Sequence, residues 1–187
     1  DLPLASDAAA VATIHVLVKM VPTALTLDPH LPCLLMCRAV NLILEHGNCD
    51  ASCYAYAELA TVLGPYFGDY RSGFQLAKLA YELVERLGFR RFEAKTYHVC
   101  GFLMAWSSHV GAARLVQRRA FEAANRDGDL THAAFCCYHL NTNLLAAGDP
   151  LSEVQREAEN GLAFVRKIRF DFAVHVIATQ LALIRTL

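Results

Sequence analysis

The sequence predicts an all-α chain built from antiparallel helical hairpins, and three observations predict it. Apolar residues recur at spacings of three and four along nearly the whole 187-residue chain, as on the buried face of an α-helix. The strict alternation of apolar and polar residues that is typical of a half-buried strand is nowhere sustained. Helix stop and start signals also return at intervals of about forty residues, which indicates one hairpin unit used repeatedly.

Start and stop signals place the individual helices. An aspartate before an apolar pattern can accept hydrogen bonds from the N–H groups of a first helical turn, and a glycine tolerates the positive φ that closes a helix. In chain order the starts are Asp7, Asp28-Pro29, Asp50, Asp69, Asp129 and Asp149-Pro150, and the stops are Gly47, Gly68, Gly88, Gly128 and Gly148. The helices are therefore expected at roughly 7–20, 29–46, 51–66, 69–87, 91–107, 110–126, 130–147, 150–167 and 170–186.

A shift of forty residues superposes these signals on one another. It places Gly68-Asp69 on Ser108-His109 and then on Gly148-Asp149, and it takes Ala80 to Ala120. This period lies between the 34 residues of tetratricopeptide repeats and the longer HEAT-type units. The sequence therefore predicts a tetratricopeptide-like α-solenoid. Small residues are expected where helices cross closely, at Ala60, Ala80, Cys100 and Ala120.

The ends of the chain and its composition indicate which class of protein it belongs to and which partners are not expected. It begins at Asp1 without Met and stops at Leu187 inside an apolar pattern, so residues 1–187 are expected to form a single helical-repeat domain excised from a larger protein. Hydrophobic residues make up 55% and charged residues 19%, which is typical of a chain with a packed core.

The net charge and the apolar runs bear on partners and location. A formal charge of −1 gives no overall positive potential to attract nucleic acid or an anionic membrane, so neither partner is expected. The sequence carries neither a signal peptide nor an apolar run long enough for a bilayer span, and a cytoplasmic location is expected.

The seven cysteines are expected to be reduced thiols packed in the core. Their number is odd, and most of them stand among apolar residues. Cys33 and Cys37, like Cys49 and Cys53, have a spacing of four that could put two metal ligands on one helical face. A complete four-ligand set with the spacing of structural zinc is missing, so we expect no stoichiometric zinc.

Catalytic motifs are also missing from the sequence. A GxxxxGK[ST] phosphate-binding loop, kinase motifs, GxSxG, HExxH and GxGxxG are all absent, so we expect no catalytic residue, no cofactor and no ATP hydrolysis by this chain.

Two groups of arginines are candidates for binding an acidic segment of a partner. Arg86, Arg90 and Arg91 surround the turn at Gly88, and Arg114 and Arg118 line one side of the following hairpin. Acidic residues interrupt both groups, so an ordinary solvated face is the alternative interpretation.

A small-molecule pocket is a second possibility for function. Its candidate lining residues are Tyr97, Trp106, His139 and Asn143, together with Tyr54 and Tyr56. Aromatic residues at helical spacing usually belong to a core, however. The polar group of His139, Asn141 and Asn143 favours an interhelix hydrogen-bond network over a ligand site.

Several short strings in the chain resemble one family. They are Val40-Asn41-Leu42, Glu45 to Ser52 (EHGNCDAS), Gly68-Asp69-Tyr70, Gly73-Phe74-Gln75, Gly128 to Thr131 (GDLT), Asn141 to Ala146 (NTNLLA), Gly148-Asp149-Pro150 and Glu157 to Leu162 (EAENGL). The sequence resembles the helical-repeat segment of very large bacterial and fungal signalling proteins. In these, a serine/threonine-kinase-like domain and a predicted ATPase precede the segment, and a GAF domain and a sensor histidine kinase follow it.

The resemblance covers most of the chain but carries over no catalytic residue, because the family's catalytic motifs lie outside it. It implies a parent protein that binds ATP and takes part in a two-component phosphorelay. The chain itself would be a noncatalytic scaffold that couples the ATPase module to the histidine kinase, with neighbouring domains or another protein as its partner. An inducer-binding solenoid of a signalling or transcription regulator remains the alternative.

Overall fold

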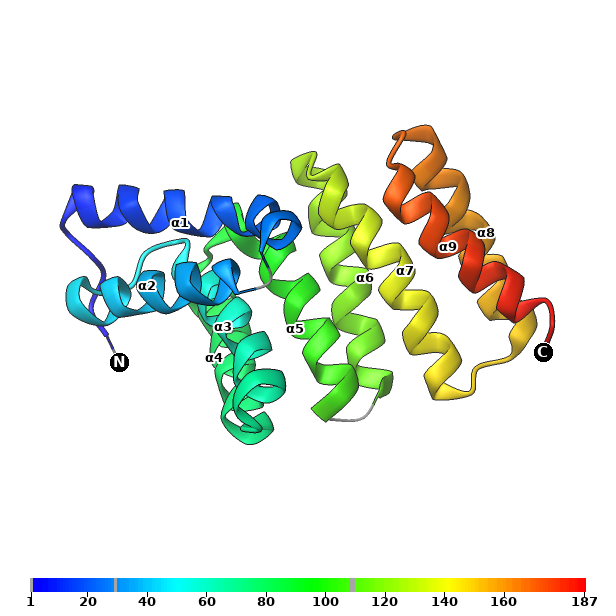
Figure 1. Cartoon of the computed structure of the whole chain (residues 1–187), viewed down its shortest axis with the longest axis horizontal. Coiled ribbons are helices and arrows are strands. Elements are labelled where there is room, and N and C mark those ends of the chain that lie inside the picture. The colour runs from blue at the N-terminus through cyan, green and yellow to red at the C-terminus, as the bar shows by residue number, and fades with distance from the viewer. Residues whose placement is uncertain (1, 29, 108–109) are drawn as a thin grey trace. The chain divides into compact units, whose positions relative to one another are not determined.

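A computed structural model describes residues 2–28, 30–107 and 110–187 of the chain. Within them it contains α1 (Ala8–Leu27), α2 (Leu31–His46), α3 (Ser52–Phe67), α4 (Tyr70–Leu87), the short 3-10 helix η1 (Arg90–Phe92), α5 (Glu93–Ser107), α6 (Val110–Asp127), α7 (Leu130–Ala147), α8 (Leu151–Lys167) and α9 (Asp171–Ile184) (Figure 1). These described residues include no strand, only one isolated parallel bridge between Leu4 and Asn48. The all-α prediction is confirmed.

The chain divides into two compact units, Asp1–Val99 and Cys100–Leu187. In the first unit α1 packs against α2, α2 against α3, and α3 against α4. Its core is built from apolar residues at helical spacing, such as Ile14, Val18 and Val21 on α1 and Met36 and Ile43 on α2, which are all fully buried.

The second unit is described by itself. Here α6 packs against α7, α8 against α9, and α7 also contacts both α8 and α9. Val154, Ala158 and Val165 on α8 and Ala173 and Ile177 on α9 form a continuous buried cluster. The predicted small residues Ala60, Ala80, Cys100 and Ala120 are buried in their respective units.

Most predicted helix ends are confirmed by the backbone. Gly47, Gly68, Gly88, Gly128 and Gly148 all have a positive φ. Asp69 accepts a hydrogen bond from the Ser72 N–H at 3.0 Å, and Asp129 accepts one from the His132 N–H at 3.2 Å. The predicted hairpin break at Ser108-His109 lies outside the described residues.

Two aspartates predicted as helix starts have a different role. Ala51 and Pro150 precede the first residues of α3 and α8, and neither helix has a side-chain cap. The Asp50 carboxylate pairs with His15, and the Asp149 carboxylate pairs with Arg114. A carboxylate held by a charged or polar partner from another element is not available to the N–H groups of its own helix.

The predicted end of the first helix was also wrong. The prediction ended it near residue 20, but α1 continues to Leu27 through Pro22. Proline removes one backbone hydrogen bond. The buried face of α1 nevertheless runs on through Val18, Val21 and Ala24, so packing favours continuing the helix. No helix within the described ranges is both long and apolar enough to cross a bilayer.

The cysteine prediction needs one correction. All seven thiols are free, and Cys49, Cys53, Cys100 and Cys136 are buried. Cys33 and Cys137 are partly buried, whereas Cys37 is exposed. Cys37 belongs to the outward stripe of α2, beside the exposed Leu34, Arg38 and Asn41.

Burial of Ala120 leads to a stability prediction. The side chain of Ala120 is fully buried on α6, so Ala120→Leu should overpack its surroundings at a cost of about 1–3 kcal/mol. For a chain of this size, the melting temperature should fall by roughly 2–10 °C. Ala163→Leu on the exposed face of α8 is the matched control and should leave melting nearly unchanged. Equal melting of the two variants by circular dichroism would refute the packing argument.

Candidate functional site

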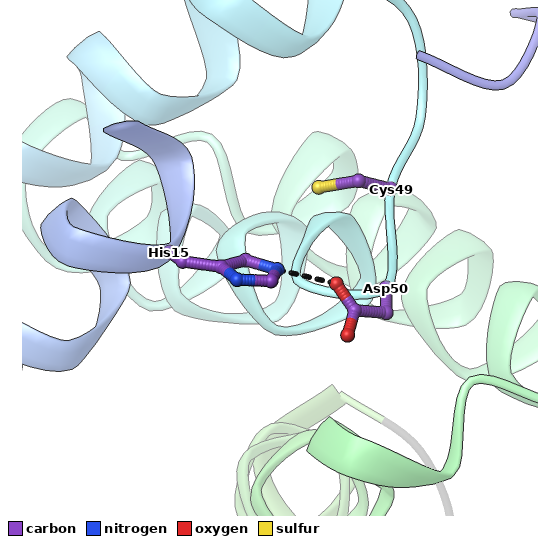
Figure 2. A group of neighbouring side chains, drawn as sticks. All are labelled: His15, Cys49 and Asp50. Carbon is purple, nitrogen blue, oxygen red and sulfur yellow. Dashed lines mark hydrogen bonds and ion pairs between the residues drawn. The ribbon is translucent and has the colours of Figure 1, made fainter. Parts of the chain in front are cut away.

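A polar cluster lies in the first unit where α1, the loop between α2 and α3, and η1 meet. Its members are His15, Cys49, Asp50 and Arg91, and we call it the His15 cluster. The His15 Nε2 atom lies 2.5 Å from Asp50 Oδ1 (Figure 2). An Arg91 guanidinium nitrogen lies 3.4 Å from His15 Nδ1 and 3.7 Å from Asp50 Oδ2. Three sequence segments are therefore joined by one set of polar contacts.

For a neutral His15 ring, the contacts with Arg91 and Asp50 fit one tautomer. A guanidinium only donates hydrogen bonds, so Nδ1 accepts from Arg91. The proton is then on Nε2, which donates to the Asp50 carboxylate. Because both ring nitrogens are engaged, this arrangement leaves no imidazole lone pair to activate the Cys49 thiol as a nucleophile.

The loop that carries Cys49 and Asp50 is held on both sides. The Asn48 N–H donates to the Pro3 carbonyl at 2.7 Å, and the Ala5 N–H donates to the Asn48 carbonyl at 2.8 Å. After the loop, the Cys49 N–H donates to Ser52 Oγ at 2.9 Å. Its position is therefore set by backbone bonds to the start of the chain and by the first residue of α3.

Aromatic packing orients the other members of the cluster. The buried Phe92 ring lies 5.7 Å from the His15 ring and stacks on Tyr54 at 6.2 Å. The Arg91 guanidinium lies over the Phe92 ring at 5.8 Å from its centroid. A cation favours the face of an aromatic ring, so Phe92 helps to hold Arg91 beside His15.

Cys49 adds a sulfur ligand to this corner. Its Sγ, a His15 ring nitrogen and an Asp50 carboxylate oxygen all lie within 4.8 Å of one another. The Ser52 hydroxyl donates toward Cys49 Sγ at 3.7 Å. Sequence reasoning missed this group because His15 lies 35 residues from Asp50 on a different helix. The adjacent Cys49-Asp50 pair is the only part of it that the sequence displays.

The predicted basic surfaces consist largely of paired arginines. Arg114 contacts both carboxylate oxygens of Asp149, at 2.5 and 2.6 Å, and Arg118 contacts Glu157 at 3.1 Å. Arg91 belongs to the His15 cluster. Arg86 and Arg90 are exposed in the first unit, whereas Arg114 and Arg118 belong to the second.

The residues predicted to line a small-molecule pocket belong to both units of the chain. Tyr97 is buried in the first unit, where its hydroxyl donates to Glu85 at 2.6 Å. Trp106 in the second unit is 76% exposed. His139 stacks on Phe102 with ring centroids 5.0 Å apart, and Asn143 is buried. Tyr54 and Tyr56 are likewise buried core residues.

The predicted interhelix polar network is confirmed at Asn141. Its side-chain amide on α7 donates to Gln180 Oε1 on α9 at 3.0 Å. Gln180 in turn donates to the Tyr138 carbonyl at 2.9 Å. These bonds tie α7 to α9 across the core of the second unit.

A cavity of about 340 Å³ lies among α6, α7 and α8 of the second unit. The Phe121 and Phe164 rings meet there edge to face at 5.4 Å, beside the Arg118–Glu157 ion pair. Burial raises the pKa of the Cys137 thiol to about 12 and raises the pKa of Cys136 well above its usual value. Both thiols therefore stay protonated at neutral pH. The lining residues are Gln117, Arg118, Phe121, Glu122, Cys136, Cys137, Leu140, Glu157, Asn160, Gly161 and Phe164.

Comparison of the chain with known protein families finds no match, and comparison with curated proteins also finds none.

Proposed function

We propose that the chain is a noncatalytic helical-repeat scaffold that couples neighbouring domains of a signalling protein. The observation that carries the proposal is the recurrence of equivalent helices. Helices α4, α6 and α8 end at Leu87, Asp127 and Lys167, each 40 residues after the one before. A near-constant interval is typical of a solenoid, in which each hairpin packs only on its neighbours.

The pairing of the basic residues supports a scaffold of this kind. Arg114 and Arg118 on α6 are bound to carboxylates of their own unit, Asp149 in the connection before α8 and Glu157 on α8, so they link α6 to the following hairpin. The sequence resemblance supplies the proposed context, an ATPase module on one side and a sensor histidine kinase on the other. A change in packing between hairpins would redirect the modules attached at the two ends.

Ala120→Leu in the full-length parent protein tests the proposal. We expect nucleotide-dependent histidine autophosphorylation to weaken, while ATP hydrolysis and basal autophosphorylation, each assayed separately, persist. The surface variant Ala163→Leu should behave like the unmodified protein. If Ala120→Leu lowers the melting temperature and leaves the coupling normal, the chain is a passive spacer and the proposal is wrong.

The cavity of the second unit favours small-molecule sensing as a second candidate function. Its volume is within the usual range for ligand sites, and its walls combine two phenyl rings with charged groups. A ligand that binds only the folded chain must raise its melting temperature. A thermal-shift screen of metabolites should then find a compound whose effect is lost in Phe164→Ala. If the screen finds no such compound, small-molecule sensing is refuted and the scaffold function is the one proposal that remains.

A further inference from the structure

We propose that His15, Cys49 and Asp50 form a binding site for one Zn²⁺ ion, in which the metal replaces Arg91. The inference is independent of the scaffold function. It revises the sequence-based expectation of no zinc, which considered only four-ligand sets along the sequence. The fold instead brings together three ligands from α1 and the loop after α2.

The donor set suits zinc. A thiolate, an imidazole nitrogen and a carboxylate oxygen are the three ligand types that Zn²⁺ uses in proteins, at about 2.0–2.3 Å. Tetrahedral angles at these bond lengths place ligand atoms about 3.3–3.6 Å apart. The three atoms now lie within 4.8 Å, with His15 Nε2 and Asp50 Oδ1 at 2.5 Å. Side-chain movements of about 1 Å would bring them to that geometry.

The surroundings place hydrogen-bond donors beside the candidate ligands. Cys49 and Asp50 precede the first turn of α3, at the positive end of its helix dipole. The Ser52 hydroxyl donates toward Cys49 Sγ. The side chains of His15 and Asp50 are 18% and 28% exposed, so water can reach the metal as a fourth ligand.

Zinc binding and the Arg91 contact cannot occur together, because they need the proton of the His15 imidazole on different ring nitrogens. In a neutral imidazole without metal, the contacts with Arg91 and Asp50 fit a proton on Nε2 and an acceptor at Nδ1. Zinc at Nε2 requires that proton to be on Nδ1, which then opposes the N–H group of Arg91. The Arg91 side chain is 54% exposed and can turn into solvent. Coordination also releases the thiol proton of Cys49 to solvent.

Cobalt substitution tests the site in the complete 187-residue chain, reduced and freed of metal. Titration with Co²⁺ should give one ion per chain, a thiolate-to-cobalt charge-transfer band in the near ultraviolet, and displacement by Zn²⁺. Cys49→Ser should abolish the band and weaken zinc binding by at least tenfold, on the order expected when a metal site loses a supporting group. Circular dichroism establishes that this variant is folded.

Two matched controls sharpen the result. Arg91→Ala should tighten zinc binding about tenfold, whereas Arg90→Ala at the neighbouring exposed position should not change it. Cys37→Ser removes an exposed thiol of α2 and should keep the cobalt band. The proposal is overturned if the band is absent, if it survives Cys49→Ser, or if Arg91→Ala binds zinc no more tightly than the unmodified chain.

Discussion

Gly47→Ala should lower the free energy of unfolding by about 2–4 kcal/mol, through backbone strain together with lost hydrogen bonds. Gly47 has φ 103° and ψ 175°, a region of backbone conformation that is essentially restricted to glycine. A Cβ atom at this position would also lie 2.6 Å from the Pro3 carbonyl oxygen and 3.1 Å from the Leu4 carbonyl carbon and the Ala5 nitrogen. The segment at the start of the chain would have to move, and its bonds to Asn48 would break.

Gly68→Ala is the matched control for this effect. Gly68 also has a positive φ, 70°, but a Cβ there meets nothing within 4 Å. Only the cost of the left-handed conformation remains, about 1–2 kcal/mol. Urea unfolding followed by circular dichroism measures both variants. If Gly47→Ala is no more destabilising than Gly68→Ala, the contact between the loop and the start of the chain does not stabilise the first unit.

Acid should destabilise the second unit through His139, by about 3 kcal/mol between neutral pH and pH 4. Burial lowers the pKa of His139 from 6.5 to about 4 in the folded chain. The unfolded chain therefore binds more protons in this window. The contribution of His139 to the stability of the folded chain is complete above pH 6.5 and is lost as the pH falls toward 4.

His139→Phe isolates this contribution. Phenylalanine preserves the stacking on Phe102 but binds no proton. The difference in unfolding free energy between the two proteins, measured by denaturant titration at several pH values, removes the contributions of all other groups. That difference should change by about 3 kcal/mol between pH 7 and pH 4. A constant difference would mean that His139 titrates alike in the folded and unfolded chain.

Local signals carried most of the fold prediction because helix ends depend on residues a few positions apart. Gly68 and Asp69 end one helix and begin the next through contacts within a single turn. Asp50 and Asp149 carry the same local signal, yet their carboxylates bind partners 35 residues away. Distant partners of this kind depend on how helices pack, which the spacing of residues along the chain does not encode.

The candidate site was less predictable for the same reason. Arg91 lies 76 residues from His15, and the two meet only because α1 and η1 fold against the same loop. The sequence grouped Arg91 with Arg86 and Arg90 as a basic surface, since these residues are neighbours along the chain. The cavity was missed as well, because Phe121 and Phe164 come from α6 and α8.

The polar links within the second unit have a consequence for how it unfolds. Arg118–Glu157 and Asn141–Gln180 each span 39 residues and join the α6–α7 hairpin to the α8–α9 hairpin. Arg114–Asp149 spans 35 residues and ties α6 to the connection between α7 and α8. In an array of repeats, cooperativity arises from the free energy of the interfaces between neighbours. Opening of either hairpin removes both of the links between them at once and uncovers the apolar face of the other. The two hairpins are therefore expected to unfold as one cooperative unit.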